Sequence, residues 1–133
     1  MTGDEFSSLN VMVIEDEAFS QQVVAKVLEK VGVASVTAAK NGAEALEMLS
    51  RAKPKIDLVI CDIEMPVMGG YEFVRQVRFG TVPGYKDISI IMLTGKDTDE
   101  NTQRALLHRI NGFLVKPARP KTLGETIRRA LKK

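Results

Sequence analysis

Five side chains with charged or hydroxyl groups stand where they could act on a common ligand. They are Glu15 and Asp16 after one short apolar run, Asp62 after a second, Thr94 after a third and Lys116 after a fourth. Carboxylates are ligands for hard divalent cations. A hydroxyl and an ammonium group can donate hydrogen bonds to charged oxygens. The set therefore indicates binding of a cation together with an anionic group.

The apolar runs before these side chains predict where the chain places them. They lack polar alternation, which is typical of strands buried on both faces of a parallel sheet. In open parallel sheets, ligands bind in the crevice outside the carboxyl ends of the strands. We therefore expect the five side chains to converge at that edge. The four runs are residues 11–14, 58–61, 90–93 and 113–115.

Helical patterns alternate with the strand patterns along the chain. A helix that ends at Gly32 is predicted by apolar residues at three- and four-residue spacing, which are Phe19, Val23, Val27, Leu28 and Val31. Five strands alternating with five helices imply right-handed crossovers and a three-layer α/β sandwich. The remaining predicted elements are a weaker strand at 33–39, a helix from Asn41-Gly42 that ends by Pro54, helices at about 71–79 and 98–110, and a last helix after Pro120.

The composition is that of one ordinary domain. At 133 residues, the chain can bury a core without disulfides or a structural metal. The formal net charge of +2 does not imply general affinity for nucleic acid, although the last helix is locally basic. The single cysteine, Cys61, excludes an internal disulfide, and no run approaches the roughly 18 apolar residues that cross a membrane. We expect a cytoplasmic protein with no nucleic-acid or membrane partner.

These motifs, in this order, resemble the CheY-like receiver domain of two-component response regulators. The matching pieces are Glu15-Asp16 after the first strand, Asp62-Ile63-Glu64-Met65-Pro66 after the third, Thr94-Gly95 after the fourth and Lys116-Pro117 after the fifth. The resemblance covers about residues 9–131, which we expect to form a single receiver domain after an N-terminal extension of residues 1–8. It implies a flavodoxin-like (βα)5 doubly wound parallel sheet with strand order 2-1-3-4-5.

With that strand order, Glu15, Asp16 and Asp62 would share one crevice. Carboxylates about 4 Å apart repel one another by roughly 4 kcal/mol at an effective dielectric constant of about 20, so the cluster favours a bound cation. Mg²⁺ suits it best, with Mn²⁺ as an alternative. The resemblance implies that Asp16 and Asp62 bind the ion directly, Glu15 through water, and Glu64 through its backbone carbonyl.

The resemblance also implies that Asp62 is the phosphoacceptor. Its carboxylate would attack a phosphohistidine and become an acyl phosphate, while Lys116 neutralises phosphoryl oxygens and Thr94 donates its hydroxyl to one of them. The added phosphoryl group would draw Thr94 inward. Phe113, where many receivers have tyrosine, would move with it as the second switch residue.

Two charged residues flank the expected phosphorylation site. Glu64 follows Asp62 by two residues, and Lys96 follows Thr94 by two. We hypothesise that Glu64 and Lys96 form an ion pair that shields the acyl phosphate from water and tunes its lifetime. The alternative is two independently solvated charges, because exposed ion pairs contribute little energy.

The expected function is that of a stand-alone phosphorylatable response regulator. It would catalyse its own phosphorylation and dephosphorylation without being an enzyme for a separate substrate. Its phosphodonor would be a sensor histidine kinase or a histidine phosphotransfer protein. The phosphorylated form would bind a downstream protein or dimerise through the face made by the fourth helix, fifth strand and fifth helix.

Several alternatives remain open. Glu15-Asp16 could lie in a helix N-cap region, and Phe113 could be an ordinary core residue. The chain could be a receiver-fold interaction module that works without phosphorylation. A metal-dependent phosphatase with Asp62 as its nucleophile would want a second aspartate two residues later, where Glu64 stands.

Overall fold

The centre of the molecule is a five-stranded parallel sheet. The computed structural model describes residues 5–95 and 109–132. The strands lie in the order β2-β1-β3-β4-β5, and every neighbouring pair is parallel. This confirms the predicted strand order and flavodoxin-like fold. The strands are β1 (Asn10–Ile14), β2 (Ser35–Ala39), β3 (Leu58–Asp62), β4 (Ser89–Thr94) and β5 (Gly112–Val115).

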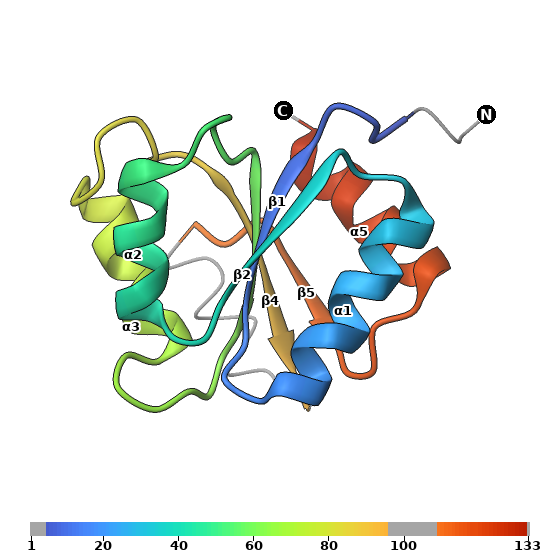
Figure 1. Ribbon diagram of the computed structural model, residues 1–133, viewed down its shortest axis with the longest axis horizontal. Helices are drawn as coiled ribbons and strands as arrows, with labels where there is room; N and C mark the ends of the chain where they lie inside the picture. The colour runs from blue at the N-terminus through green and yellow to red at the C-terminus, as the bar shows by residue number, and fades with distance from the viewer. Residues whose placement is uncertain (1–4, 96–108, 133) are drawn as a thin grey trace.

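Helices cover both faces of the sheet (Figure 1). One face carries α1 (Ala18–Val31) and α5 (Pro120–Leu131), and the other carries α2 (Gly42–Arg51) and α3 (Gly70–Phe79). This arrangement is the predicted three-layer sandwich. The helix expected at about residues 98–110 falls almost entirely outside the described residues.

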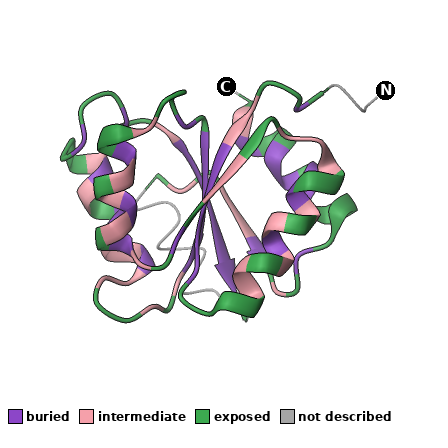
Figure 2. Ribbon diagram, in the orientation of Figure 1, coloured by how far each residue is buried: buried purple, intermediate pink, exposed green. Residues whose placement is uncertain are grey.

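The strand residues are buried because the two helical layers enclose the sheet. Every residue of β3 and of β4 is buried. Alternate residues along a strand point to opposite faces, so Met12 and Ile14 join the core on the α2 and α3 side, whereas Val11 and Val13 join the core on the α1 and α5 side. Figure 2 shows this buried band through the middle of the molecule. The strand ends therefore give the side chains that follow them defined positions.

Caps explain where the helices begin and end. Gly32 and Gly80 close α1 and α3 with φ of 97° and 95°, in the left-handed region that glycine adopts without strain. Asn41 caps α2, and its side-chain oxygen accepts a hydrogen bond from the Glu44 N–H at 2.8 Å. The Gly32 stop and the Asn41-Gly42 start are where the sequence pattern predicted them.

The described part of the predicted N-terminal extension packs on α5. Phe6 is 5% exposed and belongs to the same buried cluster as Ile127. The Arg128 guanidinium lies 5.9 Å from the Phe6 ring centre and donates hydrogen bonds of 2.6 and 2.8 Å to the Glu5 carboxylate. This segment therefore precedes the sheet but contributes to its hydrophobic core.

Candidate functional site

Three carboxylates meet at the carboxyl edge of the sheet. Glu15 and Asp16 follow β1, and Asp62 is the last residue of the neighbouring strand β3. One ligand oxygen from each residue lies within 4.8 Å of those from the other two. Glu15 and Asp62 are buried, whereas Asp16 is exposed. The cluster therefore combines one carboxylate that faces solvent with two that are shielded from it.

Glu17, the next residue along the chain, caps the helix that follows β1. Its carboxylate accepts a hydrogen bond from the Ser20 N–H at 2.8 Å, and α1 begins directly after it. The capping role that the sequence left open for Glu15 and Asp16 is thus filled by Glu17. Both acids lie ahead of the cap, where their carboxylates join the cluster with Asp62.

Glu15 is held in the interior by a charged partner. It is 1% exposed, its Oε1 lies 2.9 Å from Lys116 Nζ, and its Oε2 accepts a 3.3 Å hydrogen bond from the Glu17 N–H. Burial raises the pKa of the Glu15 carboxyl above its ordinary value, and these two hydrogen bonds offset the rise only in part. A carboxylate in this position needs the adjacent cation, because burial disfavours its charged form.

Lys116 bridges two carboxylates at the end of β5. Its Nζ lies 3.4 Å from Asp62 Oδ1, which is farther than its 2.9 Å contact to Glu15. Burial acts to lower the pKa of the Lys116 ammonium, but the hydrogen bond to Glu15 and the charge of Asp62 outweigh it, so the pKa is raised. The ammonium therefore stays charged beside the expected phosphoacceptor.

The ends of β4 and β5 complete the crevice. Thr94 is buried at the end of β4, and its carbonyl accepts a 2.8 Å hydrogen bond from the Lys116 N–H. A Cβ atom added at Gly95 would meet no atom of residues 5–95 or 109–132 within 4 Å, so these residues leave the backbone there open to approach. Phe113 is half-buried and packs against the core on the α2 and α3 side. Lys96, predicted as a tuning residue, lies outside the described residues.

The loop after Asp62 is packed against the sheet through a glycine. A Cβ atom on Gly70 would lie 2.3 Å from the Asp62 carbonyl oxygen and 2.8 Å from Met92 Cε. The Gly70 N–H donates a 2.9 Å hydrogen bond to the Ile63 carbonyl, which closes the loop. Glu64 is exposed on this loop, close in sequence to the cluster. Only glycine lets the start of α3 approach Asp62 so closely.

Sequence reasoning missed Gln21, which ties two strand ends together from α1. Its Nε2 donates to the Glu15 carbonyl at 3.1 Å and to the Ala39 carbonyl at 3.2 Å. These bonds join the end of β2 to the loop that carries Glu15 and Asp16. The sequence offered only a weak indication of this role, namely that Gln21 is a polar residue among the apolar positions of α1 that face the sheet.

The donor set fits a small divalent cation. Three carboxylates supply hard oxygen ligands at mutual distances within 4.8 Å, and the exposed Asp16 leaves a route for coordinating water. Mutual repulsion of the carboxylates is relieved in part by Lys116, and a bound cation would relieve the rest. The residues present are therefore compatible with Mg²⁺.

Comparison with known proteins identifies the family. A model of the response regulator receiver domain matches residues 11–128. The match covers most of the chain, so the chain belongs to the response regulator receiver domain family. The strand order and the acidic cluster are thus consistent with a receiver domain of the CheY type.

Individual relatives agree with this assignment. The chain is 30% identical over 119 residues to chemotaxis protein CheY1 of Helicobacter pylori, and the alignment covers 90% of this chain and 94% of CheY1. It is 34% identical over 114 residues to an uncharacterised 14.6 kDa protein of Leptolyngbya boryana, and the alignment covers 86% of this chain and 83% of that protein. It also matches 15% of the length of the sensor histidine kinase CheAY of Helicobacter pylori.

Solved structures have the same fold. Chemotaxis protein CheY4 of Vibrio cholerae superimposes with a TM-score of 0.82 at 36% identity, covering 93% of this chain and 99% of that one. The receiver domain of the histidine kinase CKI1 from Arabidopsis thaliana was solved with Mg²⁺ and BeF₃⁻. It superimposes with a TM-score of 0.84 at 26% identity, and the match covers 99% of this chain and 95% of that one. In the part of the chain that the structure describes, no helix has the length and apolar character needed to span a membrane.

Proposed function

We propose that this receiver domain accepts a phosphoryl group on Asp62 in a Mg²⁺-dependent reaction and then changes its affinity for a partner protein. One observation carries the proposal: three carboxylates converge, and Lys116 Nζ lies 3.4 Å from an Asp62 oxygen. The donor is a phosphohistidine on a sensor histidine kinase or a histidine phosphotransfer protein. The domain acts on itself in the cytoplasm, as a signalling protein and not as an enzyme for a separate substrate.

The chemistry is an in-line transfer between the donor histidine and Asp62. A carboxylate oxygen attacks phosphorus, a P–O bond forms while the P–N bond breaks, and the imidazole leaves with the electron pair. Because the transition state is loose, alignment and charge neutralisation are the main tasks of the protein. The 8% exposure of Asp62 limits access of water to the acceptor.

Lys116 neutralises charge on the transferred group. An ammonium has three donors, and its contacts to Glu15 and Asp62, at 2.9 and 3.4 Å, leave one for a phosphoryl oxygen. The Glu15 carboxylate orients the ammonium before the donor arrives. Thr94 donates its hydroxyl to a second phosphoryl oxygen, and the open backbone at Gly95 lets the group approach.

Asp16 and Asp62 would hold Mg²⁺ directly, with Glu15 acting through water and Glu64 through its backbone carbonyl. When bound, the ion would supply positive charge that offsets the negative charge of the phosphoryl oxygens. Asp16, the exposed carboxylate, is the residue whose loss most directly removes a ligand without disturbing a buried ion pair.

The output is a conformational change at the edge of the sheet. Thr94 moves toward the phosphoryl group and Phe113 fills the space that it leaves, which alters the face formed around β5 and α5. A downstream protein or a second copy of the domain binds that face. Glu64 and Lys96 tune the lifetime of the acyl phosphate by shielding it from water.

Phosphorylation by acetyl phosphate with Mg²⁺, measured by intact mass, tests the proposal. We expect wild type to gain one phosphoryl group, and chelation of the metal to abolish the gain. Asp62→Asn should gain none. Asp57→Asn is the matched control, because Asp57 precedes β3 at the opposite edge of the sheet and bonds to Asn10.

Two outcomes would contradict the proposal. Equal phosphorylation of Asp62→Asn and wild type would place the acceptor elsewhere. No phosphorylation of wild type, together with no binding of Mg²⁺ and beryllofluoride, would mean that the crevice is not competent. The interaction module that works without phosphorylation would then be the better description.

A further inference from the structure

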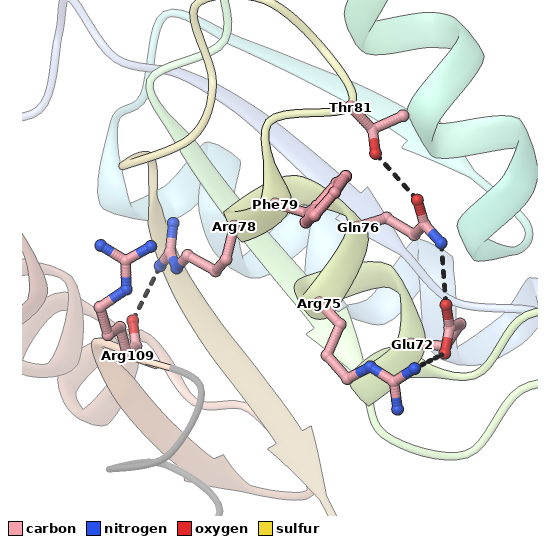
Figure 3. Close-up of a pocket in the computed structure, with 7 residues that line it drawn as sticks. All are labelled: Glu72, Arg75, Gln76, Arg78, Phe79, Thr81 and Arg109. Atoms are coloured by element: carbon pink, nitrogen blue, oxygen red, sulfur yellow. Dashed lines mark hydrogen bonds and ion pairs between the residues drawn. The ribbon is translucent and has the colours of Figure 1, made fainter.

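A groove lies at the C-terminal end of α3, away from the acidic crevice (Figure 3). α3 begins at Gly70, against Asp62, and its ten residues span roughly 15 Å. Thr81 and Arg109 contribute to the groove from the segments that follow α3 and precede β5. We call it the Phe79 groove, and its α3 residues are Glu72, Arg75, Gln76, Arg78 and Phe79.

The Phe79 groove is basic. Its described lining holds three arginines against one acid, Glu72. The Glu72 carboxylate is already engaged, because Arg75 and Gln76 each approach one of its oxygens at 3.0 Å. The Thr81 hydroxyl in turn donates a 2.8 Å hydrogen bond to the side-chain oxygen Oε1 of Gln76, which orients that side-chain amide. The lining therefore has more arginines than acids, although Arg75 itself pairs with Glu72.

Hydrogen bonds from Arg78 connect α3 to other segments of the chain beside the groove. Among the residues that the structure describes, its guanidinium donates hydrogen bonds to four oxygens on two other segments of the chain. These bonds hold the end of α3 against both segments. The acceptors are the carbonyl oxygens of Lys86, Ile88 and Arg109, each at 2.8 Å, and the side-chain oxygen of Asn111 at 3.2 Å.

Burial and neighbouring charges both act on the arginines of the groove. Burial lowers the pKa of the Arg78 guanidinium, and repulsion from Arg109 lowers it further, more strongly than the attraction of Asp87 raises it. The Arg109 guanidinium lies 3.2 Å from Asp87 but remains 55% exposed. Arg75 and Arg109 thus keep more than half of their side-chain surface exposed in the groove, although each also contacts an acid.

Phe79 adds an apolar surface to this basic setting. Its side chain is 87% exposed, the highest value among the large apolar residues that the structure describes as exposed. A single exposed aromatic residue is ordinary by itself. Here the ring stands in a groove beside Arg75, whose side chain is 64% exposed. Aromatic residues and arginine are the types enriched at protein interfaces.

We propose that the Phe79 groove binds an acidic segment of a partner protein, with an apolar side chain of that segment on Phe79. Its carboxylates pair with Arg75 and Arg109, whose side chains are more than half exposed. Charge complementarity selects this occupant, because the lining has three arginines and one acid, and an acidic segment would compete for Arg75 and Arg109 with their present partners Glu72 and Asp87. The groove needs no phosphoryl group, so it acts independently of Asp62.

Selection of binding peptides from a displayed random library tests this inference. Unphosphorylated wild-type protein is the bait, so the result does not depend on the chemistry of Asp62. We expect enriched sequences with several acidic residues around an apolar one, and weaker binding as salt is added. Their affinity should fall about tenfold in Phe79→Ala and several-fold in Arg75→Gln. Arg78 is left intact because it fastens three segments.

Phe19→Ala is the matched control. It removes the same side chain from another exposed position, at 70% exposure on α1, and should leave peptide affinity unchanged. Enriched peptides without acidic bias, or with equal affinity for wild type and Phe79→Ala, would overturn the inference. So would dimerisation of wild type that Phe79→Ala abolishes, or binding of a single-stranded oligonucleotide that competes with the selected peptides.

Discussion

The N-terminal end of α3 lies against the acidic crevice, whereas its C-terminal end carries the basic Phe79 groove. At the first end, backbone packs on backbone: Gly70 has no room for a methyl group, and the nearby carboxylates of Glu15 and Asp62 are buried. At the second end, long side chains project from the surface, and a Cβ atom added at Gly80 would have no atom of the described residues within 4 Å. One helix thus joins two regions of opposite charge and opposite packing.

The two ends of α3 are suited to different tasks. A metal and phosphoryl site needs side chains held to within fractions of an ångström, which buried strand ends and close backbone contacts provide. A docking surface needs exposed area and charge, which arginines and Phe79 provide at little cost in packing. Substitutions at the two ends should therefore act on different quantities.

The largest effect is expected at Gly70. Gly70→Ala places a methyl group against backbone atoms of Asp62 and Ile63, so we expect a loss of about 3 kcal/mol in the free energy of unfolding. Gly80→Ala meets no atoms but strains a residue at φ 95°, which costs about 1 kcal/mol. Urea denaturation measures both. Equal losses would mean that the two ends of α3 are packed alike.

A smaller effect is expected at Arg78. Arg78→Lys cannot reach all four oxygens that the guanidinium bonds, so we expect a loss of about 2 kcal/mol in the free energy of unfolding. Arg75→Lys, at an exposed position on the same helix, should change it by less than about 0.5 kcal/mol. Thermal and urea unfolding give the comparison. A loss at Arg75 as large as at Arg78 would show that the groove is not fastened by Arg78.

Gln21 offers a finer test of the crevice. Gln21→Ala removes two hydrogen bonds that hold the loop of Glu15 and Asp16, so Mg²⁺ affinity should fall about fivefold, or about 1 kcal/mol. Gln22→Ala, one residue later and exposed, should leave the affinity unchanged. Amide chemical shifts followed during a Mg²⁺ titration measure both. Equal affinities in the two variants would exclude a positioning role for Gln21.

The smallest effect is expected from the titration of Glu15. Its pKa is raised by burial above the ordinary value of 4.5, so the folded protein binds this proton more tightly than the unfolded chain does. In metal-free buffer, wild type should lose stability relative to Glu15→Gln as pH rises from 4.5 through the folded pKa. Unfolding free energies across that window measure the trend. A difference that does not vary with pH would contradict it.

The sequence predicted the elements that depend on local pattern. Uninterrupted apolar runs identified β1, β3 and β4, and Gly32 marked the end of α1. The strand order came from the family resemblance, because apolar periodicity does not specify which strands are neighbours. Given that order, the meeting of Glu15, Asp16 and Asp62 followed from their positions after the strands.

What the sequence could not predict depends on contacts between distant residues. Lys116 lies closer to Glu15 than to Asp62, a detail decided by side-chain packing across 101 positions of sequence. The two acceptors of Gln21 are backbone carbonyls, which carry no sequence signal. Phe6 lies outside any predicted strand or helix, yet it is buried on α5.

The thiol of Cys61 gives the molecule a built-in chemical reporter. It is the only cysteine, it is completely buried, and burial raises its pKa, so it does not react with thiol reagents while β3 stays in the sheet. Labelling therefore requires local opening of the strand that ends in Asp62. The labelling rate of the unmodified protein would therefore measure how often β3 opens. Comparing that rate with and without a bound cation would measure how far the cation slows the opening.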